Sequence, residues 1–252
     1  MENICKTCGY THTLNYCNRC GQKVIDKRFT TKELLHDLFH NLIHFDKGFL
    51  FTFYSLLIRP QIVIKEYING ATKKYTNPAT FAIYLIAFAT FFIVRQDYIE
   101  RNAQSISNFL YNQDQVQLSV QKHFLEFIKH YLQYFTLLYI PFFALVSKWL
   151  FKTYNYAEHL ILICYTYALV TIISLPLTLL YDHYSFTKFV SIAIVVVYYT
   201  YTYHKLLSIG ILKSFFKTIL FYILSYFLFT FAFTFGTLLV LFIKKLIVGH
   251  AF

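Results

Sequence analysis

Residues 157–181 have the sequence AEHLILICYTYALVTIISLPLTLLY, in which no acidic or basic side chain follows Glu158 and His159. A helix needs about 20 mostly apolar residues to cross the hydrocarbon core of a membrane, which is roughly 30 Å thick. This stretch is long enough to do so. It therefore predicts a membrane-spanning helix, and the rest of the chain can be interpreted around it.

Four further apolar runs flank this stretch, so the sequence predicts an all-α polytopic membrane protein with about five transmembrane helices. Hydrophobic residues make up 57% of the chain and charged residues 14%, against about 25% charged residues in soluble domains. A soluble fold would have to bury all five runs at once. The predicted bundle covers residues 79–252, and its other spans are 79–94, 131–151 (with a kink at Pro141), 186–207 and 215–243.

The basic residues predict the orientation of these spans. With five spans, most of the 23 Lys and Arg residues fall on the side of the N-terminus, and loops rich in Lys and Arg stay in the cytosol. The first thirty residues are polar, so no cleavable signal peptide is expected. The sequence therefore predicts a multi-pass protein of the cytoplasmic (inner) membrane, with the N-terminus cytosolic and the C-terminus outside.

Residues 5–23, CKTCGYTHTLNYCNRCGQK, predict a metal site in the first 27 residues. Each of two Cys-x-x-Cys pairs can direct two thiolates at one tetrahedral ion, and the glycine after each pair permits a left-handed backbone. Four thiolates close the coordination sphere, which favours structural Zn²⁺ over a hydrolytic zinc. Two redox-active disulfides are the alternative, although the reducing cytosol favours the metal. The four predicted ligands are Cys5, Cys8, Cys17 and Cys20.

Residues 28–78 are predicted to form cytosolic interfacial helices between the ribbon and the bundle. In residues 33–47, polar and apolar side chains take opposite faces of a helical wheel, which predicts an amphipathic helix on the membrane surface. His36, His40 and His44 share its polar face, where their spacing suits a second metal site or simply a solvated face. Residues 48–81 predict two short helices, with lysines beside the anionic lipid of the inner leaflet.

Several motifs follow the cysteine pairs in a fixed order, and together they resemble a known family. They are Arg28-Phe29-Thr30, Asp46-Lys47-Gly48-Phe49, Thr52, Pro60, Tyr67-Ile68-Asn69-Gly70, Tyr75-Thr76-Asn77-Pro78 and Asn155-Tyr156-Ala157-Glu158-His159. The chain resembles uncharacterised bacterial multi-span membrane proteins with an N-terminal CxxCG…CxxCGQ zinc ribbon, a domain of unknown function. The resemblance implies a cytoplasmic-membrane location and a zinc ribbon, and it implies no enzyme activity. Where such proteins tend to have Gly-x-Arg, this chain has Gly70-Ala71-Thr72.

The sequence favours a non-enzymatic interaction, scaffold or assembly module, whose ribbon meets a cytosolic protein partner or a second copy of the chain. A pore or carrier for a small solute is the first alternative. The second is a metal-dependent membrane enzyme acting on lipid, with Glu158 and His159 as catalytic candidates, although Glu158 also suits a helix cap. No GxSxG, P-loop or HExxH motif is present. Binding of nucleic acid is disfavoured, because few aromatic residues accompany the basic ones in the ribbon.

Overall fold

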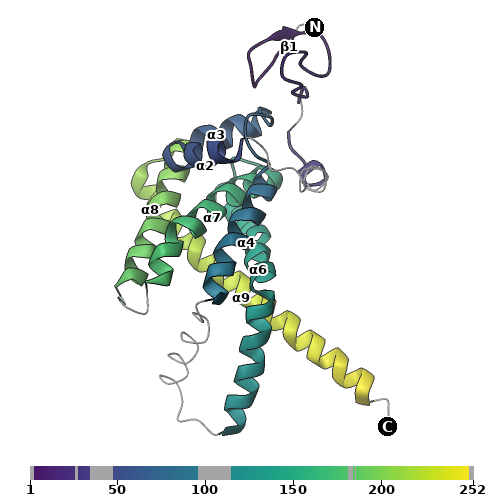
Figure 1. Ribbon diagram of the computed structural model, residues 1–252, viewed down its shortest axis with the longest axis vertical. Helices are drawn as coiled ribbons and strands as arrows, with labels where there is room; N and C mark the ends of the chain where they lie inside the picture. Colours follow the sequence, from purple (N-terminus) through teal and green to yellow (C-terminus); the bar gives the residue numbers. More distant parts are fainter. Residues whose placement is uncertain are drawn as a thin grey trace.

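The computed structural model describes residues 3–25, 28–34, 48–95, 115–180, 184 and 186–249, with the side chains of 115–129, 133 and 237–249 left aside. A small cysteine ribbon stands at one end of a helical bundle (Figure 1). The ribbon holds a two-stranded antiparallel sheet of β1 (Asn3–Ile4) and β2 (Thr11–His12). The described helices are α2 (Phe49–Ile58), α3 (Pro60–Ile68), α4 (Pro78–Arg95), α6 (Gln115–Leu150), α7 (Tyr156–Leu179), α8 (Thr187–Leu207) and α9 (Ile211–Gly249).

Helix α7, which contains the stretch that opens the sequence analysis, lies at the centre of the bundle. It packs against α4, α6 and α8 along its length, and against α2 and α3 near the ribbon end. Its buried side chains surround the helix rather than forming a single stripe, as expected for a helix that is apolar all round. The core of the protein is therefore arranged around this helix.

Three helices in the described part of the chain are long and apolar enough to cross a membrane: α4, α7 and the Ile211–Gly236 part of α9. The sequence analysis predicts two more spans, at 131–151 and 186–207. Both runs are helical and belong to the same bundle, as α6 and α8. Helix α8 is less apolar because its second half contains the run YYTYTYH.

Helices α6 and α9 are longer than the predicted spans. At a rise of about 1.5 Å per residue, the 36 residues of α6 and the 39 of α9 give lengths of about 54 and 58 Å. Both helices continue beyond the bundle on the side away from the ribbon (Figure 1). The apolar run of α6 is thus only the later part of a helix that begins at Gln115.

Helices α2 and α3 lie across the ribbon end of the bundle (Figure 1). Pro60 opens α3, where its missing N–H costs nothing. The backbone N–H of Thr76, just before α4, donates to Thr52 Oγ1 of α2 over 2.9 Å. The Tyr165 hydroxyl of α7 donates to the Thr76 carbonyl over 2.6 Å, so the loop before α4 is fixed to both α2 and the central helix.

The amphipathic helix predicted at 33–47 lies, from residue 35 onward, outside the described residues. The described residues before it, Thr31 to Leu34, are helical. Thr30 and Glu33 hydrogen bond to each other in the pattern of a capping box: Thr30 N donates to the Glu33 carboxylate, and Glu33 N donates to Thr30 Oγ1. This pattern marks the start of a helix near residue 31.

Candidate functional site

The four cysteines predicted as metal ligands come together in the ribbon. Their sulfur atoms all lie within 4.8 Å of one another. Cys5 Sγ is 3.5 Å from Cys20 Sγ, and Cys8 Sγ is 3.6 Å from Cys17 Sγ. These separations are far longer than the roughly 2.05 Å of a disulfide. All four cysteines are free.

The two Cys-x-x-Cys pairs have the same backbone hydrogen bonds. Gly9 N donates to the Cys5 carbonyl over 2.9 Å, and Gly21 N donates to the Cys17 carbonyl over 2.7 Å. Both glycines have a positive φ, 72° for Gly9 and 68° for Gly21, a region that side chains other than glycine seldom occupy. Each pair is thus a tight turn that directs its two sulfurs to the same point.

The turns favour the thiolate at two of the four cysteines, Cys5 and Cys17, whereas the pKa values of Cys8 and Cys20 are raised. Burial raises the pKa of Cys5, but hydrogen bonds from the backbone N–H groups of Cys8 and Thr7 outweigh this effect and lower the pKa to about 6. The pKa of Cys17 is lowered in the same way, by the N–H groups of Cys20 and Arg19 acting against burial. Thiolates are the form in which cysteine binds metal.

The cluster fits a tetrahedral metal ion. With Zn–S bonds of about 2.3 Å, the sulfurs of a tetrahedral site lie about 3.8 Å apart, close to the two distances given above. Four thiolates at this separation would repel one another strongly, and one divalent cation removes that repulsion. The ribbon is therefore a candidate metal centre held by Cys5, Cys8, Cys17 and Cys20.

His12 is not a fifth ligand of this cluster. Its side chain is buried, with 6% of its surface exposed, whereas a spare histidine next to a metal clip is expected to face solvent. His12 pairs with Asn3 across the two-stranded sheet. The neighbouring Thr11, paired in the same strand, is exposed, so the two side chains face opposite sides of the strand.

Gln22, the residue after the second Cys-x-x-Cys-Gly, attaches the ribbon to the loop between α3 and α4. Its Oε1 accepts from the backbone N–H of Lys73 over 2.8 Å, and its Nε2 donates to Thr72 Oγ1 over 3.0 Å. Gly70, with φ of +101°, brings the same loop against Ile25. The position where the chain departs from the Gly-x-Arg pattern is thus the place where the ribbon docks.

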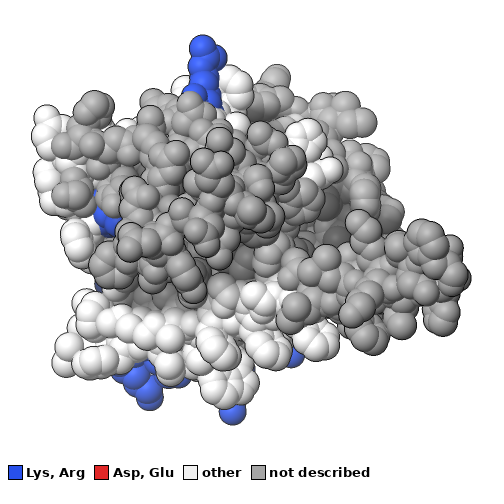
Figure 2. Space-filling view, turned by 90° about the horizontal axis from the view of Figure 1, so that it is seen from below, with Lys and Arg blue, Asp and Glu red and all other residues white. Residues whose placement is uncertain are grey.

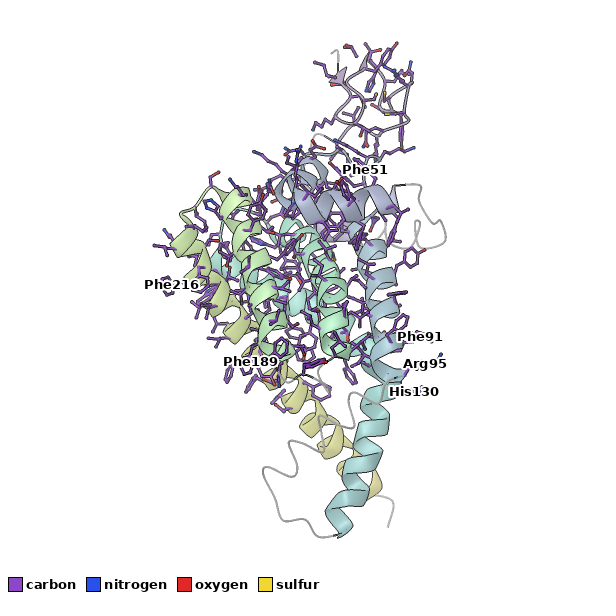
Figure 3. The ribbon with its side chains drawn as sticks, turned by 60° about the vertical axis from the view of Figure 1, so that its left-hand side comes forward. Phe51, Phe91, Arg95, His130, Phe189 and Phe216 are labelled. Atoms are coloured by element: carbon purple, nitrogen blue, oxygen red, sulfur yellow. The ribbon has the colours of Figure 1, made fainter. Side chains whose placement is uncertain are left out.

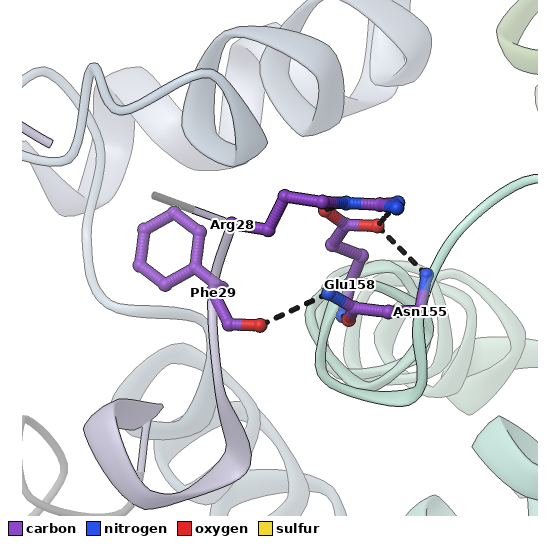
Figure 4. Close-up of polar contacts among 4 residues, drawn as sticks. All are labelled: Arg28, Phe29, Asn155 and Glu158. Carbon is purple, nitrogen blue, oxygen red and sulfur yellow. Dashed lines mark hydrogen bonds and ion pairs between the residues drawn. The ribbon is translucent and has the colours of Figure 1, made fainter. Parts of the chain in front are cut away.

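A second attachment joins the segment after the ribbon to the first turn of α7 (Figure 4). Arg28 Nε donates to Glu158 Oε1 over 2.9 Å, and Arg28 Nη2 donates to Glu158 Oε2, giving a two-pronged ion pair. Asn155 Nδ2 donates to the Phe29 carbonyl over 3.0 Å. The Glu158 side chain is only 3% exposed, whereas that of Arg28 is 63% exposed.

Glu158 is also part of the N-terminal cap of α7. Its backbone N–H donates to Asn155 Oδ1 over 2.9 Å, and its Oε2 accepts from the Asn155 backbone N–H over 2.8 Å. This reciprocal pattern is a capping box. The carboxylate considered as a catalytic candidate thus takes the capping role, together with a bond to the cation of Arg28.

His159 points to a different side of α7 from Glu158, as expected for neighbours about 100° apart on a helix. Ser147 Oγ of α6 lies 2.8 Å from His159 Nδ1 and 2.7 Å from the Tyr203 hydroxyl of α8. None of these three side chains is exposed. The three residues form a hydrogen-bonded network that joins α6, α7 and α8 inside the bundle.

The structure therefore separates the sequence-predicted site residues into distinct groups. The four cysteines form one cluster, Glu158 belongs to the attachment of the ribbon segment, and His159 belongs to the internal network. Across the described residues, no second group of possible metal ligands was found. His36, His40 and His44 lie outside the described residues.

The sequence analysis did not predict which residues contact Glu158, His159 and the ribbon. It had quoted some of them only as parts of motifs. Gln22, Arg28 and Asn155 all belong to motifs quoted for the family resemblance, and all three make contacts at the ribbon end. Ser147 carried no signal at all. The motif letters by themselves did not indicate which of these residues meet in space.

Residues 46–92 match a protein family of unknown function, DUF3667. The matched region includes α2, α3 and most of α4, and the ribbon precedes it. Neither the comparison with curated proteins nor the comparison with solved structures gave a match.

Proposed function

We propose that this chain is an interaction module of a bacterial cytoplasmic membrane, in which a cytosolic ribbon binds one structural Zn²⁺ and docks a protein partner. In this proposal the bundle provides the membrane anchor, and Gln22 and Arg28 fix the ribbon to the bundle. The single observation that supports it most is that the ribbon exposes large apolar side chains.

The ribbon exposes four large apolar side chains although it is the smallest part of the described protein. Ile4 is 71% exposed, Leu14 and Tyr16 are each 57% exposed, and Tyr10 is 45% exposed. Exposed apolar groups mark contact surfaces when they form one patch, and in this proposal the four side chains do so. The exposed side chains project from a rigid, metal-closed unit, so a partner could bind them without ordering the chain.

The charge of the ribbon indicates what such a partner would be like. Residues 3–25 contain Lys6, Arg19 and Lys23 and no acidic residue, so the ribbon keeps a small net positive charge when four thiolates hold one Zn²⁺. Complementary charge favours encounter and excludes like-charged competitors. The proposed partner is therefore a cytosolic protein with an acidic surface around an apolar contact.

Zinc is the proposed metal because of the ligand set. A tetrahedral group of four thiolates is typical of Zn²⁺ or of iron–sulfur centres, and two turns of Cys-x-x-Cys-Gly in a short ribbon are typical of structural zinc. When bound, the ion would supply folding free energy to a ribbon that has no hydrophobic core of its own.

Five passes through the membrane are part of the proposal. Successive helices α4, α6, α7, α8 and α9 would then alternate in direction, which puts the ribbon and the C-terminus on opposite sides, as they lie in Figure 1. Figure 2 shows the molecule from that opposite end, where several described Lys and Arg side chains lie at the edges of the view. The excess of Lys and Arg on the N-terminal side of the sequence supports a cytosolic ribbon.

Site-specific photo-crosslinking in cells tests the docking proposal. A photoreactive residue at Leu14 is expected to give a discrete protein adduct, which the Cys5→Ser/Cys8→Ser variant loses while its spans still insert. Phe189, exposed at the other end of the bundle (Figure 3), is the matched control position. An adduct that persists in the cysteine variant, or no adduct at Leu14, would overturn the proposal.

A carrier for a small solute is a second candidate, favoured by polar atoms inside the bundle. Thr200 Oγ1, Thr218 Oγ1 and Ser225 Oγ are buried and have no hydrogen-bond partner among the described residues. Buried polar groups without partners call for an explanation, and polar groups inside a membrane bundle often mark a pathway.

Flux measurements in proteoliposomes separate this candidate from the first. Tyr199 faces the interior with 0% exposure, whereas Tyr201 is 37% exposed. If the bundle carries protons, Tyr199→Phe should reduce proton uptake driven by a potassium gradient, and Tyr201→Phe should not. Uptake no faster than in protein-free vesicles would exclude proton transport by the chain.

A further inference from the structure

Helix α2 presents an apolar face that the described residues cover in part at Phe51, whose ring stacks on Tyr75, and otherwise leave exposed. The helix carries no charged side chain, and only Thr52 and Leu56 are buried. Leu50 is 75% exposed and Tyr54 64% exposed. The exposed apolar side chains recur at helical spacing along one side: Leu50, Phe51, Tyr54, Leu57 and Ile58.

The position of α2 indicates that its exposed face lies in the membrane and not in water. Helix α2 is fixed to the start of the spanning helix α4 by the Thr76–Thr52 hydrogen bond and by the contact of Phe49 with Phe81, whose ring centroids are 5.3 Å apart. It therefore lies at the level where a span meets the membrane surface. With ten residues it is too short to cross, and apolar helices of this length occur as interfacial or re-entrant segments.

Two backbone carbonyls near the end of α2 have hydrogen-bond partners within the protein. The Tyr198 hydroxyl of α8 donates to the Leu56 carbonyl over 3.0 Å, and the Arg59 N–H donates to the Ser55 carbonyl over 2.8 Å. In hydrocarbon, where water is not at hand, backbone polar groups need such partners. With these partners the last turn of α2 can lie in hydrocarbon.

Charge and aromatic residues beside α2 complete the pattern of a membrane interface. Arg59, directly after α2, and Lys65, in α3, are both exposed. Trp149, 64% exposed, is in the last turn of α6 at the same end of the bundle. Tryptophan is enriched at the headgroup level, and cations beside it attract anionic lipid.

The exposed side chains of the spanning helices are large and apolar, like those of α2. Phe91 of α4 is 58% exposed and Phe216 of α9 is 67% exposed, and both point away from the bundle (Figure 3). We infer that α2 is an in-plane membrane helix whose Leu50, Tyr54 and Leu57 face inserts among the acyl chains of the leaflet on the ribbon side. The contact is with lipid, and it goes beyond the docking of a protein by the ribbon.

Fluorescence quenching in vesicles tests this inference. The chain has one tryptophan, so Trp149→Phe gives a silent background in which Tyr54→Trp reports on α2. The matched control is Tyr16→Trp in the ribbon, because Tyr16 is 57% exposed. The full-length protein is placed in vesicles of phosphatidylcholine and phosphatidylglycerol, with either brominated acyl chains or iodide in the aqueous phase.

We expect the α2 reporter to emit at shorter wavelength than the ribbon reporter and to be quenched several-fold more strongly by brominated lipid than by iodide. The ribbon reporter should show the reverse. Iodide quenching of the α2 reporter as strong as that of the ribbon reporter would place α2 in water and overturn the inference. Protection from both quenchers would show a protein or a second copy on the face, which also overturns it.

Discussion

Arg28 and Glu158 are 130 positions apart in the sequence, yet they form a two-pronged ion pair that holds the segment after the ribbon against the first turn of α7. The carboxylate is almost completely buried and the guanidinium is mostly exposed. Removing Arg28 should therefore destabilise the protein more than removing Glu158. Without Arg28, the buried carboxylate of Glu158 would have neither its cation nor water.

The effect of removing the pair should therefore be non-additive. Arg28→Gln leaves a buried, unpaired carboxylate, so we expect a lower thermal midpoint in detergent than for the wild type. Adding Glu158→Gln should restore part of the loss, since the amide carries no charge. The midpoint can be followed by the fluorescence of Trp149. If the double variant instead shows the sum of the two single losses, the residues act independently.

The glycines after the cysteine pairs should control metal affinity. Alanine at Gly9 or Gly21 would have to adopt a positive φ, which costs roughly 1–2 kcal/mol and weakens Zn²⁺ binding by about tenfold. Gly21→Ala and Gly9→Ala should have similar effects, because the atoms nearest to the Cβ position of Gly21 belong to the flexible end of the Lys73 side chain. Competition with a chromophoric chelator measures this affinity. Gly48→Ala, at a position without positive φ, is the control, and equal affinities in all three variants would contradict the turn geometry.

Glu66 should make the stability of the α3–α4 loop depend on acidic pH. Burial raises the pKa of Glu66, but the hydrogen bonds from Lys74 Nζ and Tyr75 Oη, with the charge of Lys74, lower it below its ordinary value of 4.5. The unfolded chain therefore binds a proton at higher pH than the folded protein does. This contribution is complete above pH 4.5 and disappears as the pH falls through the folded pKa.

Glu66→Gln isolates that contribution. The wild type should be more stable than the variant at neutral pH, and the difference should shrink as the pH is lowered below 4.5. Thermal midpoints measured over this range for both proteins give the comparison directly. A difference that stays constant with pH would show that the Lys74 and Tyr75 contacts do not depend on the charge of Glu66.

Ser147 should be required for the packing of α6, α7 and α8. Ser147→Ala removes the group that contacts both His159 Nδ1 and the Tyr203 hydroxyl, and leaving buried polar groups unsatisfied costs about 1–3 kcal/mol. Unfolding in denaturant measures the loss. Ser191→Ala, at a partly exposed position of α8, should be close to neutral. Equal losses in both variants would contradict a specific network.

Metal content should settle whether the histidines of residues 33–47 form a second site. We expect one zinc per chain in gently solubilised wild type, and the same value in a His36→Ala/His40→Ala/His44→Ala variant, because the four-cysteine cluster accounts for it. Elemental analysis against protein concentration gives the number. Two metals in the wild type and one in the variant would instead favour the metal-dependent enzyme.

Much of the local structure follows from the sequence alone. The cysteine spacing predicts the four-sulfur cluster because a tight turn fixes two sulfurs within a few residues of each other. The apolar runs predict helices at α4 and α7, because a run without charge can be stable only when it is buried or in lipid. The start of α6 at Gln115 was not predicted, since its first turns are too polar to form part of an apolar run.

Only the tertiary structure decided which of these segments contact one another. Spacing and periodicity act over one or two turns, whereas the contacts of Arg28 with Glu158, of Gln22 with Lys73 and of Ser147 with Tyr203 join segments between 51 and 130 residues apart. Such contacts depend on how the helices pack around α7. The sequence by itself thus determined a membrane bundle with a cysteine ribbon, and the packing of the bundle decided how the ribbon is held.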